Sequence, residues 1–136
     1  GRTARGMEEI TRLMREALGF LQTENFVMAE ESYALALEAA GSTLGEEHAT
    51  TTSLLGHLAR VCSHQGKHDL AAQMLERQVF NLRKQGVRDP GLATSLLELS
   101  DAKQRLGLSD EAEKLAQEAT DMLREVVPEA DGEASG

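Results

Sequence analysis

The chain has 136 residues, of which 40% are hydrophobic, 27% are charged and only two are proline, a balance typical of one folded helical domain. Its formal net charge of −9 argues against nucleic acid and anionic membranes as partners, because both attract basic surfaces. The single cysteine, Cys62, excludes an intramolecular disulfide, and no apolar segment is long enough to cross a membrane. We therefore expect a soluble, cytoplasmic, helical protein.

Six amphipathic helices are predicted in chain order, from apolar residues spaced three and four positions apart. Residues 1–6, which precede Met7, are interpreted as an expression-tag remnant and are left outside the fold. The predicted helices span residues 7–22, 26–41, 49–65, 68–86, 91–106 and 109–127. The acidic, small-residue segment 128–136 is expected to form a flexible tail.

Turn residues separate the predicted helices. Glycine tolerates the left-handed conformation that ends many helices, and we expect it just past a helix at Gly41, Gly66, Gly86 and Gly107. The pair Asp89-Pro90 predicts a break followed by a new helix start.

The helices form three similar pairs. Ala29 and Ala71 occupy the same place in successive copies, 42 residues apart, and Ala112 follows 41 residues later. Small residues at this place allow the two helices of a pair to approach closely. The sequence therefore predicts three repeats, at about 7–47, 48–89 and 90–127, because a single pair cannot bury its own apolar faces.

The repeat motif is clearest in the middle copy. It consists there of a leading leucine, a leucine followed by a small residue, a core cysteine, a turn glycine and a second small residue. These are, in order, Leu55, Leu58-Ala59, Cys62, Gly66 and Ala71. This pattern resembles the tetratricopeptide repeat, in the long form found in kinesin light chains. The sequence departs from the pattern at Glu24 in place of the turn glycine, at Gln78 in place of a small residue, and at Lys103 in place of an aromatic one.

The resemblance implies an all-α fold of three helix-turn-helix repeats, whose six antiparallel helices form a right-handed α-solenoid. It also implies that a partner protein or peptide binds the concave groove lined by the first helix of each repeat. The groove positions implied are Thr11, Met14, Leu18, Leu21, Ser53, Gly56, Arg60, Ser63, Thr94, Leu97, Asp101 and Gln104. The asparagines that hold a peptide backbone in related grooves are absent, since these sites read Gly56-His57 and Leu97-Glu98.

Two functions remain open. The first is an adaptor or scaffold that binds another protein in the groove. The second is a structural assembly module that oligomerises, or packs inside a larger chain, through an apolar face of the last helix. That face is predicted at Leu115, Met122, Val126 and Val127.

No residue pattern indicates an enzyme, a metal or a cofactor. His64 and His68 have the spacing of a metal-binding pair, but Gly66 predicts a turn between them. Cys62 falls at a core position, where cysteine behaves as a small hydrophobic residue. We therefore expect no catalytic residues, no metal and no cofactor.

Overall fold

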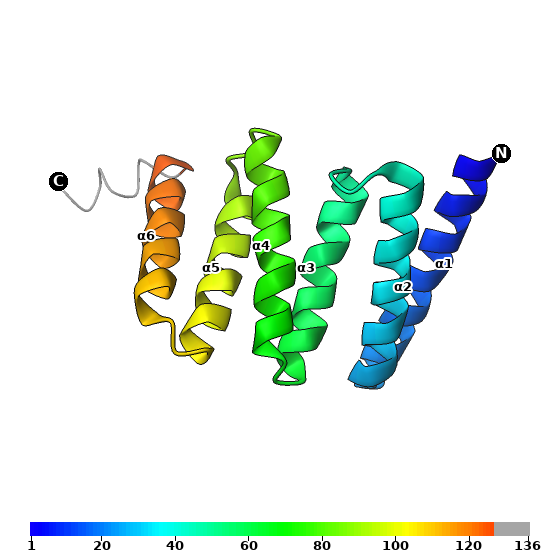
Figure 1. The fold of residues 1–136 in the computed structure, drawn as a ribbon, viewed down its shortest axis with the longest axis horizontal. Helices are drawn as coiled ribbons and strands as arrows, with labels where there is room; N and C mark the ends of the chain where they lie inside the picture. Colours follow the sequence, from blue (N-terminus) through cyan, green and yellow to red (C-terminus); the bar gives the residue numbers. More distant parts are fainter. Residues whose placement is uncertain (127–136) are drawn as a thin grey trace.

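The computed structural model describes residues 1–126, which form six α-helices and no strand over that range (Figure 1). The helices are α1 (Arg2–Gln22), α2 (Phe26–Leu44), α3 (Ala49–His64), α4 (His68–Lys84), α5 (Pro90–Arg105) and α6 (Ser109–Val126). The predicted all-α fold of three helix pairs is confirmed. The tail predicted at 128–136 lies outside the described residues.

Two helix ends differ from the prediction by more than two residues. Helix α1 begins at Arg2, so residues 2–6 continue the helix, and Gly6 lies so close to Thr43 of α2 that an added Cβ would come within 2.4 Å of it. Helix α2 continues through Gly41 to Leu44, and Gly45 ends it with a φ of +108°. Gly41 was therefore wrongly expected to lie past the helix end, because the apolar pattern continues beyond it.

The turns between the helices of a pair follow the expected chemistry. Gly66 and Gly107 adopt positive φ angles of +78° and +81°. Glu24, at the place of the missing turn glycine, adopts the same left-handed conformation with φ of +55°. Asn25 then caps α2, where its side chain accepts a hydrogen bond from the Met28 backbone N–H at 3.2 Å. The first repeat thus keeps its turn without glycine.

The helices stand side by side in an antiparallel row, and each packs on its neighbours in the chain (Figure 1). Ala29, Ala71 and Ala112 are all buried, as their shared place in the three pairs predicts. Asp89 caps α5, where its carboxylate accepts a hydrogen bond from the Leu92 N–H at 3.1 Å, and Pro90 is the first helical residue. The result is a row of three hairpins joined by two junctions between repeats.

Candidate partner-binding groove

The junction between α2 and α3, here called the first junction, is filled by aromatic rings. Phe26 stacks on His64 with ring centroids 4.9 Å apart, and Tyr33 stacks on His57 at 5.5 Å. Beside them, Glu30 of α2 accepts a 2.8 Å hydrogen bond from the Lys67 ammonium. These contacts close the space between the first and second repeats.

Burial at the first junction affects its titratable groups. Burial lowers the pKa of His57, and the nearby Arg60 cation lowers it further. Burial also raises the pKa of the Tyr33 hydroxyl. The hydrogen bond from Lys67 lowers the pKa of Glu30. The environment of His57 therefore favours the neutral form of its ring.

The junction between α4 and α5, the second junction, opens instead into a groove of about 840 Å³ between α3, α4 and α5. Its buried lining is small and apolar, and consists of Ala59, Ala71, Leu75 and Ala102. Leu75 stands 42 residues after Tyr33, at the same place in its repeat, and so a shorter side chain without a ring lies where Tyr33 fills the first junction. We call this space the α3–α5 groove.

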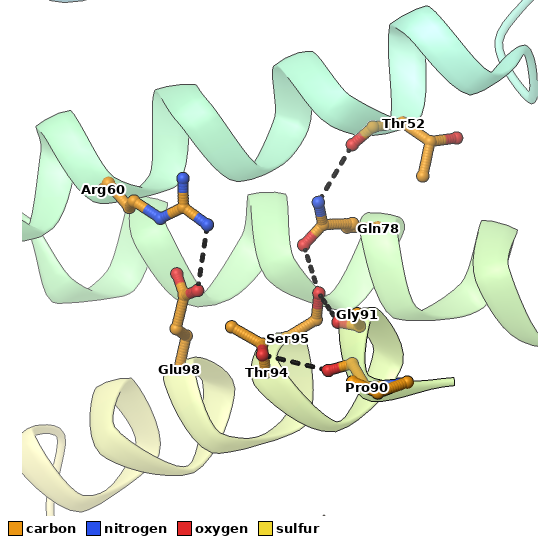
Figure 2. A network of polar contacts seen from close by, with 8 residues as sticks. All are labelled: Thr52, Arg60, Gln78, Pro90, Gly91, Thr94, Ser95 and Glu98. Atoms are coloured by element: carbon orange, nitrogen blue, oxygen red, sulfur yellow. Dashed lines mark hydrogen bonds and ion pairs between the residues drawn. The ribbon is translucent and has the colours of Figure 1, made fainter. Parts of the chain in front are cut away.

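The walls of the α3–α5 groove are polar and partly exposed. The Arg60 guanidinium on α3 pairs with the Glu98 carboxylate on α5 at 3.2 Å (Figure 2). Farther along α5, Arg105 donates to Asp101 at 3.0 Å. On the same helix, the Leu97 side chain lines the groove and is 43% exposed. The groove therefore offers an apolar surface bounded by charges of both signs.

His68 is also part of the lining. Its Nδ1 atom is buried and has no hydrogen-bond partner among the described residues. Native proteins satisfy nearly all such atoms with protein, water or ligand groups. The groove thus contains one polar atom whose hydrogen-bonding capacity is unused.

A hydrogen-bonded network links three helices at the N-terminal ends of α3 and α5. The Gln78 amide nitrogen of α4 donates to the Thr52 backbone carbonyl of α3 at 3.1 Å, and the Gln78 amide oxygen accepts from the Ser95 hydroxyl of α5 at 2.8 Å (Figure 2). One turn further along α4, the Asn81 amide donates to the Thr52 hydroxyl at 3.1 Å. Thr52, Asn81 and Ser95 are buried and Gln78 is half-buried, so these bonds satisfy polar groups that are largely shielded from water.

Gly56 provides the room for Gln78. A Cβ added to Gly56 would come within 2.5 Å of the Gln78 amide nitrogen. In the first and third repeats the same two places hold Met14 with Ala36, and Leu97 with Ala119. The middle repeat reverses this arrangement of large and small residues. Gly56 is therefore a buried packing position, and its prediction as a groove-lining residue is wrong.

The structure brings together five of the predicted groove positions. They line the α3–α5 groove and are Arg60, Ser63, Thr94, Leu97 and Asp101. Ser53 and Gln104 are exposed on the same helices but lie outside the lining.

The positions predicted on α1 belong to a different surface. Met14 and Leu21 are partly buried against the core, whereas Leu18 is 54% exposed and Thr11 is exposed. None of the four lines the α3–α5 groove. The structure thus gives a groove at the second junction that is lined by predicted positions on α3 and α5 and by none of those on α1.

The prediction missed the other lining residues, which are Ala59, His64, Gly66, His68, Ala71, Leu75, Glu98, Ala102 and Arg105. It used only the first-helix positions that the family resemblance assigns to a groove. The sequence signal that could have located the groove is the change from Tyr33 to Leu75, because a smaller side chain at an equivalent position leaves space between the helices.

The apolar face predicted on the last helix is not exposed at its described positions. Met122 is buried in the core, and Leu115 packs against it. The protein itself covers Met122 almost completely and Leu115 in part, which leaves little of the predicted face free at these two positions. Val126 ends α6, and Val127 lies outside the described residues.

On α6, the positions equivalent to those with which α4 packs on its following neighbour hold small or polar residues. Ala116 and Thr120 stand 41 residues after Leu75 and Val79, which are buried on α4. Thr120 is exposed. This surface of α6 therefore lacks the large apolar residues with which α4 packs on its following neighbour.

Neither a reactive thiol nor a metal-binding cluster is found in residues 1–126. The Cys62 thiol is buried, and burial raises its pKa to about 11, so it stays protonated and unreactive at neutral pH. Within these residues no group of three or more His, Cys, Asp or Glu side chains could hold a metal ion. No helix in the described range has the length and apolarity to cross a bilayer.

The family model of the tetratricopeptide repeat matches residues 12–79. Among solved structures, BtubC (BKLC) from P. vanneervenii superposes with a TM-score of 0.79 at 25% identity, over 86% of this chain and 47% of that chain. The TPR domain of Arabidopsis FLU superposes with a TM-score of 0.77 at 20% identity, over 88% of this chain and 98% of that one. This chain thus spans about half the length of BtubC. No curated protein sequence matches it significantly.

Proposed function

Because the chain belongs to the tetratricopeptide repeat family, whose domains are generally protein–protein interaction modules, we propose that it binds a peptide segment of a partner protein in the α3–α5 groove. It acts as an adaptor or scaffold and performs no chemistry of its own. The observation that carries the proposal is a groove of about 840 Å³ with an apolar lining. It lies between α3 and α5, the helices that the repeat pattern places on the binding side.

The lining and the walls support a peptide ligand in different ways. Ala59, Ala71 and Leu75 leave room for an apolar side chain, whose transfer from water favours binding. Arg60 and Asp101 lie on opposite walls and carry opposite charges, which can interact with charged or polar groups of a peptide. Such interactions determine the orientation of the bound peptide more than its affinity. We expect a bound segment with one apolar side chain in the groove and polar groups along its rim.

The alternative function, assembly through the last helix, has less support. Leu115 and Met122 are directed into the core, and the outward positions Ala116 and Thr120 are small or polar. Stable subunit interfaces have well-packed apolar centres. Among its described residues, α6 exposes one large apolar side chain, Leu123, which is too little for such a centre.

Two exposed leucines provide a matched test of the groove. Leu97 lines it and is 43% exposed, whereas Leu35 on α2 is 47% exposed and lies outside it. Peptides enriched on the wild-type chain from a random display library serve as probes, and fluorescence anisotropy gives their dissociation constants. We expect Leu97→Glu to weaken binding at least tenfold, or roughly 1.4 kcal/mol, and Leu35→Glu to leave it unchanged. Equal affinities for both variants would overturn the proposal.

A further inference from the structure

Helices α3 and α5, which form the walls of the groove, are connected at two levels. Near their N-terminal ends, Gln78 of α4 lies between them and bonds to both, through the Thr52 carbonyl and the Ser95 hydroxyl (Figure 2). Farther along, Arg60 and Glu98 pair directly across the groove. The relative position of the two walls depends on these links and on the packing of each wall against α4.

The two links differ in strength. The Arg60 and Glu98 side chains are 54% and 28% exposed, and exposed ion pairs contribute little because water screens them. The Gln78 bonds join the buried residues Thr52 and Ser95, where an unmade hydrogen bond costs more than an exposed one. The Gln78 link, which is better shielded from water than the ion pair, is therefore the stronger constraint on α5.

Gln78 is also specific to the second junction. Its equivalents in the first and third repeats are Ala36 and Ala119, whose side chains cannot reach a neighbouring helix through hydrogen bonds. The middle repeat accommodates the longer side chain because Gly56 has no Cβ to displace it. The junction that contains the groove is thus the one in which a polar side chain links three helices.

From this arrangement we infer that Gln78 is a positioning residue for the groove: by linking the N-terminal ends of α3 and α5, it fixes the separation of the two walls. Removal of the link frees α5 to tilt against α4, so that the distance between the α3 and α5 walls varies, while α3 and α4 stay packed. Any effect of Gln78 on peptide binding rests on the proposed function, whereas its effect on the separation of the walls is independent of that function.

The test measures wall separation in the free protein by double electron–electron resonance. Spin labels on cysteines at Ser63 of α3 and Gln104 of α5 report the groove, and a second pair at Gln22 of α1 and Ser63 reports the first junction. A Cys62→Ala background removes the native thiol. Circular dichroism melting curves establish that each variant is folded.

Two variants break the link in different ways. Ser95→Ala removes the bond to α5, and Gln78→Met keeps a side chain of similar length without its hydrogen bonds. Both are expected to broaden the Ser63–Gln104 distance distribution and leave that of Gln22–Ser63 unchanged. Ser100→Ala is the matched control, because the Ser100 hydroxyl on the same helix donates to the Ala112 carbonyl of α6 at 2.6 Å and does not link α5 to α3 or α4. It should change neither distribution.

A wild-type Ser63–Gln104 distribution in folded Ser95→Ala would overturn the inference, and this variant decides the outcome if Gln78→Met does not fold. A broadening of the same size in Ser100→Ala would also overturn it, because the effect would then be unspecific. Peptide binding plays no part in these distances, so failure of the proposed function leaves the result readable.

Discussion

Equivalent positions of the two junctions between repeats hold different side chains, which fill the first junction and leave the second open. At the first junction, Tyr33 and Phe26 fill the space between helices and stack on His57 and His64. At the second, Leu75 and His68 stand at the same places, and the space remains as a groove. A repeated fold can therefore seal one junction and open the next by changing side-chain size at a fixed place.

The closed junction should depend strongly on Tyr33. Replacing this buried ring by alanine removes its packing and leaves a cavity, and we expect Tyr33→Ala to lower the free energy of unfolding by about 3 kcal/mol. Urea denaturation followed by circular dichroism gives the value. The control is Phe80→Ala, because Phe80 is 61% exposed on α4 and its loss should change stability by less than about 0.5 kcal/mol. Similar losses in both variants would show that Tyr33 does not seal the junction.

The open junction should be sensitive to Gly56. Alanine normally stabilises a helix interior by roughly 1 kcal/mol relative to glycine. At Gly56, however, the added methyl group displaces the Gln78 amide from its buried hydrogen bonds, each of which contributes about 1 kcal/mol. We expect Gly56→Ala to destabilise the protein by about 1 kcal/mol, as measured by urea denaturation.

Gly19 of α1 is the matched control for Gly56, because an added Cβ there meets nothing within 4 Å. Gly19→Ala should therefore stabilise the protein. In a Gln78→Ala background the effect of Gly56→Ala should also become stabilising, since the clash is gone. A stabilising effect of Gly56→Ala in the wild-type background would contradict the proposed packing.

A smaller effect concerns pH. Burial and Arg60 hold the pKa of His57 below its ordinary value of 6.5, so folding favours the neutral ring. The stability from this preference is fully present above pH 6.5 and is lost as the pH falls through the lowered pKa. His57→Gln should therefore make the free energy of unfolding less sensitive to acidification between about pH 7 and pH 5. The same pH dependence in both proteins would argue against a buried neutral ring.

The sequence predicted the helices well because their signals are local. Apolar spacing, the turn glycines and the Asp89-Pro90 break set six helices whose starts at residues 26, 49, 68 and 109 agree with the structure. The site was predicted less well, because the groove depends on which side chains fill a junction between distant residues. Lys103 illustrates this limit: at an expected aromatic place, its side chain is only 15% exposed and pairs with Glu76 of α4 at 2.6 Å.

The comparison of junctions predicts that a groove can be closed by transplanting the residues that fill the other one. Leu75→Tyr with Glu98→His places the Tyr33–His57 pair of the first junction at the equivalent positions of the second. Isothermal titration calorimetry of this double variant, with a peptide selected on the wild-type chain, tests the claim directly. We expect a folded protein with cooperative thermal unfolding that no longer binds the peptide, whereas wild-type affinity in the folded variant would contradict a binding site between α3 and α5.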